Sequence, residues 1–592
     1  MRRPGPALTL ALALALAAAC SGQDQGQPGA GTDRGTYVHA GISEASTLDP
    51  AIAYDTSSHY LLINVYEPLL DFKGSSLTEL EGRIAEKVPS RENGLISADG
   101  RTYAFPIRKG VRFHEGGRLT PEDVRYSLLR FMLLDAAGGP SALLLEPVTG
   151  SAVTRGKDGK PLDEVFAKAD AAVRVDGDKV LVTLDKPFAP FLTVLASWGL
   201  IVPKDWCASH GAWDGSSATW KQYNGGPKTA SYLHDHANGS GPFKLERWQK
   251  DKNEFALVRF DGYWKGPAKL ERAVVKVVPE FRTRKLMLAS GDADSIQADY
   301  LQLPLLKSAE GVQVIDDLPR IDMSPSIFFV QDIKTQDNPY VGSGKLDGQG
   351  IPPDFFADIE VRKGFAHALD YDGYINDVNQ GKGSRANSFI PKGMFGHNPG
   401  QKTRDYDRDK AEACFKKAHG GKLWKKGFKF TFVYNTGNQA REVVANMFKR
   451  SLESINPKFV IETRPVPWSA LLDLSNASKL PMFTMGWTPD FPDPHNFAFH
   501  FMHSQGNYPR LQGYRNEEAD RLVTAAMTEL DPARRREFYR RLQEIAYDDV
   551  PSLFVLNSVL FRVQRSWVDG YVYNPVHPGS PELCPLYTLS KR

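Results

Sequence analysis

The spacing of apolar residues along the chain predicts short strands that alternate with helices. Segment 179–184 is rich in β-branched residues, which is typical of a strand, whereas segment 121–132 repeats apolar residues at helical spacing. The last third continues the alternation, with strands predicted at 428–434, 459–463 and 480–485 and a helix at 443–452. This pattern predicts an α/β protein, and 592 residues are too many for one hydrophobic core.

Local signals in the first half predict where individual elements begin. One helix is expected to begin near Asp55 or Thr56, and another at Pro121 with Thr120 as its N-cap. The alternating segment 100–108 predicts a strand, and residues 111–114 are its expected hairpin partner.

Two prolines stiffen a loop in the last third, Gly-Trp-Thr-Pro-Asp-Phe-Pro-Asp-Pro at 486–494. Pro489 and Pro492 fix φ and remove backbone donors, so the segment cannot continue a helix or a central strand. Asp490 would be held in place three residues after Trp487, a pair suited to a ligand with a cation and some apolar surface. The alternative is a proline-rich turn with Trp487 packed in the core.

The N-terminus predicts export. Arg2 and Arg3 precede an apolar run at 7–19, too short to span a bilayer but suited to a signal peptide covering 1–19. The tract Leu-Ala-Ala-Ala-Cys that ends at Cys20 resembles a bacterial lipobox, which makes Cys20 the predicted lipidation site. Residues 20–35 lack large apolar side chains and predict a lipid-anchored flexible tether. An ordinary secretory signal, with Cys20 left near the mature terminus, is the alternative.

Composition excludes several classes of protein. The net charge of +3 is spread along the chain, which argues against a nucleic-acid partner. Cys207, Cys414 and Cys584 are far apart, which excludes zinc ribbons and C-x-x-C redox motifs, although two of them could form one disulfide. No apolar run after the N-terminus is long enough to cross a membrane, so only the N-terminal lipid is expected to touch one.

Seven segments, spread from about residue 36 to about residue 575, resemble the extracytoplasmic solute-binding proteins of peptide-type ABC importers, solute-binding family 5. They lie at 48–50, 64–69, 102–114 with 119–124, 239–243, 261–264, 361–370, and 486–490 with 493–494. The resemblance implies a periplasmic-binding-protein-like two-lobed clamp (type II, cluster C), with an extra small domain inserted in the N-terminal lobe. The implied limits are 36–72 for the first part of lobe I, 73–204 for the inserted small domain, 205–300 for the second part of lobe I, 301–548 for lobe II and 549–592 for a closing segment of lobe I.

The resemblance also implies a function. The protein would capture di- or oligopeptides by hinge closure, in the periplasm or at the cell surface, and deliver them to an ABC permease. It would do so as a monomer, without a cofactor and without a chemical reaction. Asp490 would accept the peptide's α-ammonium group, Gly486 and Thr488 would supply main-chain bonds, and Trp487 would line a side-chain pocket. Two further aromatic residues, Tyr54 and Tyr66, are expected at the ligand. Gly241 is the remaining predicted contact, because the Gly-Ser-Gly-Pro turn at 239–242 lets the backbone come close to another group.

Other ligands, and one other class of protein, are also compatible with the sequence. Members of the resembled family bind sugars, opines, haem, glutathione or nickel chelates, and the aromatic residues would suit a sugar nearly as well as a peptide. A secreted hydrolase using Asp490 and Asp493 is a remote alternative, since no nucleophile motif supports it. No metal site is predicted, because the nearby histidines lack further ligands and their expected role is packing or a place on the surface; they are His495, His500 and His503. Arg385 is the nearest loop candidate for the ligand's carboxylate.

Overall fold

The computed structural model describes residues 33–592 except 43, 253, 437 and 577–583. The predicted signal peptide, Cys20 and most of the predicted tether lie outside the described residues. Within the described part of the chain, no helix has both the length and the hydrophobicity needed to span a bilayer. Among the described residues, Cys207, Cys414 and Cys584 form no disulfide with one another.

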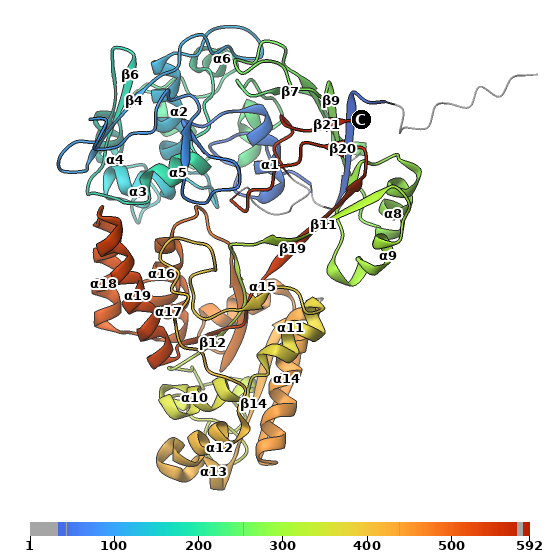
Figure 1. Ribbon diagram of the computed structural model, residues 1–592. Coiled ribbons are helices and arrows are strands. Elements are labelled where there is room, and N and C mark those ends of the chain that lie inside the picture. Colours follow the sequence, from blue (N-terminus) through green and yellow to red (C-terminus); the bar gives the residue numbers. More distant parts are fainter. Residues whose placement is uncertain (1–32, 43, 253, 437, 577–583) are drawn as a thin grey trace, which may run out of the picture.

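A seven-stranded sheet forms the core of the first lobe, in the upper half of Figure 1. Its strand order is β11-β19-β10-β1-β9-β8-β7, with β1 parallel to both β9 and β10 and the other pairs antiparallel. The strands are β1 (Thr36–Gly41), β7 (Phe243–Gln249), β8 (Glu254–Arg259), β9 (Arg272–Val277), β10 (Ser295–Ile296), β11 (Val312–Pro319) and β19 (Val559–Arg565). Helices of this lobe include α1 (Thr56–Val65), α6 (Lys204–Ser209), α7 (Trp220–Tyr223), α8 (Phe281–Ser290) and α9 (Pro304–Lys307).

A five-stranded sheet forms the core of the second lobe, in the lower half of Figure 1, with the order β15-β14-β16-β12-β17. Its strands are β12 (Met323–Phe329), β14 (Phe428–Asn435), β15 (Phe459–Val466), β16 (Met482–Trp487) and β17 (Ser552–Phe554). Around it lie α10 (Ile359–Ala368), α11 (Tyr371–Asn379), α12 (Arg408–Lys417), α13 (Lys422–Lys426), α14 (Gln439–Ile455), α15 (Trp468–Asn476), α16 (Pro494–Met502), α17 (Asn507–Gln512), α18 (Glu517–Thr528) and α19 (Pro532–Asp549). The strands and the helix predicted for the last third are confirmed.

A small antiparallel sheet, β4-β6-β5, packs with helices α2 to α5 beside the first lobe. These elements are β4 (Thr102–Pro106), β5 (Val173–Asp176), β6 (Lys179–Thr183), α2 (Pro121–Leu133), α3 (Ala142–Thr149), α4 (Asp163–Ala172) and α5 (Phe191–Ser197). The hairpin predicted between 100–108 and 111–114 is wrong, because β4 pairs with β6 and the chain does not form a strand at 111–114. The two predicted helix starts are confirmed: Asp55 caps α1, and Thr120 caps α2 in a capping box with Asp123.

The chain crosses between the two large sheets twice in the second half, between β11 and β12 and again between β17 and β19. The crossing strands β11 and β19 lie side by side where the two halves join (Figure 1). Two-stranded pairs complete the described strands: β2 (Leu70–Phe72) with β3 (Leu80–Gly82), β13 (Ser384–Arg385) with β18 (Leu556–Asn557), and β20 (Val568–Asp569) with β21 (Ser590–Lys591). The residue limits implied for the separate domains stay a prediction.

Candidate functional site

The proline-containing loop connects a central strand of the second lobe to a helix. Strand β16 ends at Trp487, and α16 begins at Pro494, so 488–493 form the predicted loop. Because β16 lies between β14 and β12, a proline within it would remove a ladder hydrogen bond, and the strand ends before Pro489.

Asp493 and Asp490 have different roles in this loop. The carboxylate of Asp493 caps α16 by accepting a hydrogen bond from the backbone N–H of His495 at 2.8 Å. It also forms a buried, bidentate ion pair with Arg535 of α19, at 2.6 and 2.7 Å. Its oxygens are therefore committed to the fold, and Asp490 and Asp493 do not form the free carboxylate pair that glycoside hydrolysis needs.

Asp490 lies where three parts of the molecule meet. Its carboxylate accepts hydrogen bonds from the Tyr54 hydroxyl, just before α1, and from the Asn496 side chain, at 3.1 Å for the latter. Its carbonyl oxygen accepts a hydrogen bond from the indole N–H of Trp198, which follows α5 of the small domain, at 2.7 Å. Burial raises the pKa of Asp490, and the hydrogen bonds from Tyr54 and Asn496 offset part of that rise.

The neighbouring Phe491 fixes the loop against the other lobe. Its side chain is buried in the apolar core shared by the first lobe and the small domain, with its ring 6.4 Å from that of Phe188. A further bond between the halves joins the backbone N–H of Ala189 to the carbonyl of Met527, at 2.9 Å. These contacts join the second lobe to the first lobe and the small domain on this side of the molecule.

Asn496, in the first turn of α16, orients both residues singled out in the loop. Its amide oxygen accepts from the Trp487 indole N–H at 2.7 Å and from the Asp490 backbone N–H at 3.4 Å, while its amide nitrogen donates to the Asp490 carboxylate. Asn496 is not among the site residues predicted from the sequence. The available signal was a polar residue among the aromatic and apolar positions at the start of this helix.

A cavity of about 440 Å³ opens beside this loop, which is within the usual size range for small-ligand sites. Its walls come from the segment before α1, the small domain and the second lobe. The lining residues are Tyr54, Ala142, Leu143, Glu146, Pro147, Gly150, Asp185, Lys186, Pro187, Phe188, Trp487, Asp490, Phe491, His495, Asn496, Phe499, His500 and Met527. Three predicted site residues, Tyr54, Trp487 and Asp490, are thus brought together at one cavity.

The other four predicted site residues do not line this cavity. Tyr66 is fully buried, and Thr488 is exposed. The turn containing Gly241 makes the close approach that was predicted, but to the end of α1, since a Cβ at Gly241 would lie 2.8 Å from the Val65 carbonyl oxygen. Gly486 already uses its carbonyl to accept a hydrogen bond from Tyr508 at 2.8 Å.

Comparison with known proteins identifies the chain. The family model described as "Bacterial extracellular solute-binding proteins, family 5 Middle" matches residues 79–509. The chain belongs to this family. Because the family consists of solute-binding proteins, the chain is a solute-binding protein rather than an enzyme.

Relatives of this family 5 protein match almost its whole length. The "Probable D,D-dipeptide-binding periplasmic protein DdpA" of Escherichia coli K12 is 25% identical over 543 residues, covering 90% of each chain. The "Heme-binding protein A" of Haemophilus influenzae is 26% identical over 555 residues, covering 91% of this chain and 90% of its own. The solved structure of the periplasmic binding protein DppA from Helicobacter pylori, in complex with peptide STSA, has a TM-score of 0.68 at 23% identity. The match covers 94% of this chain and 98% of that one, which confirms the two-lobed fold.

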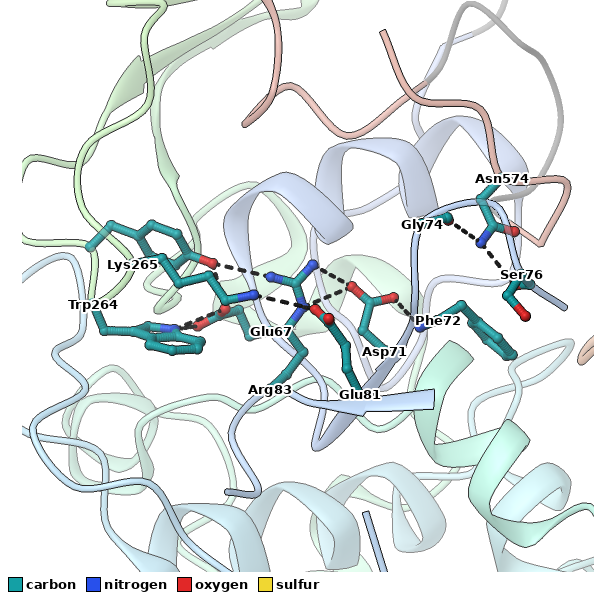
Figure 2. A network of polar contacts seen from close by, with 11 residues as sticks. Glu67, Asp71, Phe72, Gly74, Ser76, Glu81, Arg83, Trp264, Lys265 and Asn574 are labelled. Carbon is teal, nitrogen blue, oxygen red and sulfur yellow. Dashed lines mark hydrogen bonds and ion pairs between the residues drawn. The ribbon is translucent and has the colours of Figure 1, made fainter. Parts of the chain in front are cut away.

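Two segments that carry the family 5 resemblance, 64–69 and 261–264, are joined by buried hydrogen bonds. Figure 2 shows Glu67, from the segment 64–69, whose buried carboxylate accepts hydrogen bonds from the indole N–H of Trp264 at 2.9 and 3.0 Å. The Tyr263 hydroxyl donates to the same carboxylate at 2.8 Å. Nearby, Arg83 forms an ion pair with Asp71 at 2.5 Å (Figure 2). Burial raises the pKa of Glu67, and the Arg83 charge lowers it in part.

The remaining candidates from the sequence are Arg385 and the histidines after the loop, of which His495 and His500 line the cavity. Arg385 forms an ion pair with Asp405 at 2.8 Å and does not line the cavity. His500 packs against the Trp487 ring with the ring centroids 4.0 Å apart, and His495 lies at the cavity wall. Burial lowers the pKa of His495 to about 4 and that of His500 to about 3, so both are neutral near pH 7. In the part of the chain that the structure describes, no group of three or more potential ligand side chains is placed to hold a metal ion.

Proposed function

We propose that this solute-binding protein captures peptides and delivers them to an ABC-type permease, with Asp490 accepting the ligand's α-ammonium group. The proposal rests on the hydrogen bonds and charges around the Asp490 carboxylate. It lies on the wall of a 440 Å³ cavity and accepts hydrogen bonds from neutral donors only, and no described lysine or arginine lies within 4.0 Å of it to form an ion pair. A carboxylate has about four lone-pair sites, so an ammonium group can join the two existing donors.

The surroundings favour a peptide over anionic ligands such as haem and glutathione. The relative DdpA is named for dipeptide binding, whereas another relative is named for haem. Haem and glutathione are anionic, and three carboxylates but one ammonium group line the cavity: Glu146, Asp185 and Asp490 against Lys186. Like charges without compensation are costly in a partly desolvated site, which disfavours an anionic ligand. The ring of Trp487 supplies contact area for an apolar side chain and attraction for a cation.

A matched pair of peptides tests this function. By isothermal titration calorimetry, a short peptide with a free amino terminus should bind, and the same peptide with an N-acetyl group should bind at least about tenfold more weakly, because a charge-assisted hydrogen bond is lost. Equal affinity for the two peptides would contradict the role of Asp490. Tighter binding of a sugar or haem than of any peptide would contradict the peptide function itself.

We further propose that the mature protein is a monomer held at the membrane by lipid on Cys20, with 20–35 as its tether. The support is the sequence pattern at the N-terminus together with membership of an extracellular family. After expression in a bacterial host, the wild type should partition with the membrane fraction, and a Cys20→Ser variant should not. Recovery of wild type and variant in the same soluble fraction would contradict the anchor.

A further inference from the structure

Two aromatic residues from outside the second lobe bond to Asp490 at different atoms. The Tyr54 hydroxyl donates to its carboxylate, and the indole N–H of Trp198 donates to its backbone carbonyl at 2.7 Å. The two aromatic rings also pack against each other, with their centroids 5.5 Å apart. Tyr54 and Trp198 therefore contact Asp490 as one packed pair.

The pair is fixed on its own side of the molecule. Tyr54 directly precedes Asp55, whose carboxylate caps α1. Trp198 follows α5, and its ring packs edge-on against the imidazole of His59 in α1, with the centroids 5.0 Å apart. Side chains that neighbours already hold in place lose little further conformational freedom when they bond a partner. The bonds to Asp490 therefore form at a low cost in entropy.

Asp490 is also bonded within its own lobe, by Asn496 of α16. The amide nitrogen of Asn496 donates to the carboxylate at 3.1 Å, and its amide oxygen accepts from the Asp490 backbone N–H at 3.4 Å. A group that binds a ligand works best when packed neighbours hold it within about 0.5 Å of its productive position. Because Tyr54 and Trp198 belong to the other half of the molecule, Asp490 has its full set of bonds only when the halves are in contact.

We propose that Tyr54 and Trp198 are positioning residues for recognition of the ligand's α-ammonium group: contact between the lobes brings them to Asp490, and their bonds fix its carboxylate for the ion pair. The inference rests on the proposed role of Asp490 and adds the residues that make this role depend on lobe contact. Trp198 fixes the backbone of Asp490, whereas Tyr54 bonds the charged group itself. The two roles can therefore be measured separately.

Calorimetric titration of Trp198→Phe tests the role of the indole. The probes are trialanine, trileucine and trilysine, each with a free and with an acetylated amino terminus, and the acetylated peptide is measured by its displacement of the free one. Phenylalanine keeps a ring at this position and removes the N–H donor. The ratio of free to acetylated affinity should fall about two- to tenfold, the usual effect of one hydrogen bond, because only the free peptide uses the charge of Asp490.

Tyr54→Phe tests the role of the hydroxyl through the pH dependence of affinity. The hydrogen bond from Tyr54 lowers the pKa of Asp490, so its removal should raise that pKa further above the ordinary value. The carboxyl group then becomes neutral at a higher pH, and affinity for the free peptide should begin to fall at a higher pH than in the wild type. Trp198→Phe should not move this pH, because the indole bonds the carbonyl oxygen. The other titratable groups that line the cavity are the same in both variants: Glu146, Asp185, Lys186, His495 and His500.

Two matched substitutions away from the cavity serve as controls. Trp206→Phe removes an indole N–H that donates to Glu115 at 2.7 Å, and Tyr514→Phe removes a hydroxyl that donates to Asp549 at 2.7 Å. Neither Trp206 nor Tyr514 lines the cavity. Both control variants should keep the wild-type affinities, the wild-type ratio and the wild-type pH profile.

The outcomes separate the inference from the proposed function. If Trp198→Phe weakens the free and the acetylated peptide equally, or if Tyr54→Phe keeps the wild-type pH profile, the inference is overturned and the peptide function stands. A wild type that binds free and acetylated peptides equally would refute the role of Asp490, and the inference with it. If none of the tripeptides binds the wild type, the proposed function fails together with the inference.

Discussion

Replacing Asp490 with alanine is expected to weaken the binding of a free-amino peptide by about 30-fold to several thousand-fold. The range corresponds to the cost of about 2–5 kcal/mol for truncating one partner of a buried charge pair, since the ligand's ammonium group would be left without a counter-charge. Tyr54 and Asn496 cannot replace the carboxylate, because a hydroxyl and an amide carry no net charge. Isothermal titration calorimetry with one peptide, wild type and variant, measures the difference.

Two controls separate this effect from damage to the loop. Thr488→Ala removes an exposed side chain from the same loop and should leave the affinity unchanged. The second control is pH. Because burial raises the pKa of Asp490, its carboxyl group becomes neutral at a higher pH than an ordinary aspartate, and wild-type affinity should fall as the pH drops through that raised pKa. Asp490→Ala should lack this step, and an alanine variant that binds as tightly as the wild type would rule out the ion pair.

The sequence predicted the loop well because its determinants are local. Two prolines, a strand before them and a capping acid after them suffice to place 488–493 between β16 and α16. The partners of Asp490 could not be predicted in this way. Trp198 is 292 residues away and Tyr54 is 436 residues away, and both reach Asp490 only because the lobes fold and close around the loop.

The incorrect hairpin prediction also shows that local sequence patterns do not determine contacts between distant segments. Residues 102–106 and 111–114 both have the alternation of strands and are separated by a turn, so local pattern favoured pairing them. In the structure, β4 pairs with β6, and Ala104 lies opposite Leu181. Pairing of strands that are distant in sequence depends on the packing of the whole small domain, including α2 to α5, which local alternation does not specify.

Resemblance to a family indicates function only at some of the matching residues. Within the 486–494 segment, Asp490 lines the cavity, whereas Asp493 caps a helix and pairs with Arg535. Glu67 and Asp49, from two other matching segments, are buried in polar networks that hold the first lobe and the small domain together. Glu67 also lines a small cavity, yet both of its oxygens accept hydrogen bonds from Trp264. A matching carboxylate is therefore a candidate ligand contact only where its oxygens are not committed to bonds within the fold.

Arg130→Met is expected to lower the free energy of unfolding by about 3–5 kcal/mol, because it leaves Asp49 buried without a counter-charge. The guanidinium of Arg130, on α2, bonds both oxygens of Asp49 at 2.5 and 2.6 Å, and the two side chains are 2% and 0% exposed. Burial alone would raise the pKa of Asp49, but the charge of Arg130 holds it below its ordinary value. Thermal and urea unfolding, followed by circular dichroism, measure the loss.

A double-substitution cycle shows whether the loss comes from the unpaired charge or from lost packing. Asp49→Asn/Arg130→Met removes both charges, so it should be more stable than Arg130→Met alone, although the introduced amide would keep the hydrogen bonds from Ser231 and the Ala51 backbone only in part. The exposed pair Lys221–Asp163 offers a matched control within the same region, and Lys221→Met should change stability by less than about 1 kcal/mol, since exposed ion pairs contribute little.

If the double variant is no more stable than Arg130→Met, the cost arises from packing around α2 and not from the buried carboxylate. An Arg130→Met variant as stable as the wild type would mean that Asp49 reaches solvent or takes up a proton at little cost, and that the ion pair does not hold the segment before α1 against the small domain.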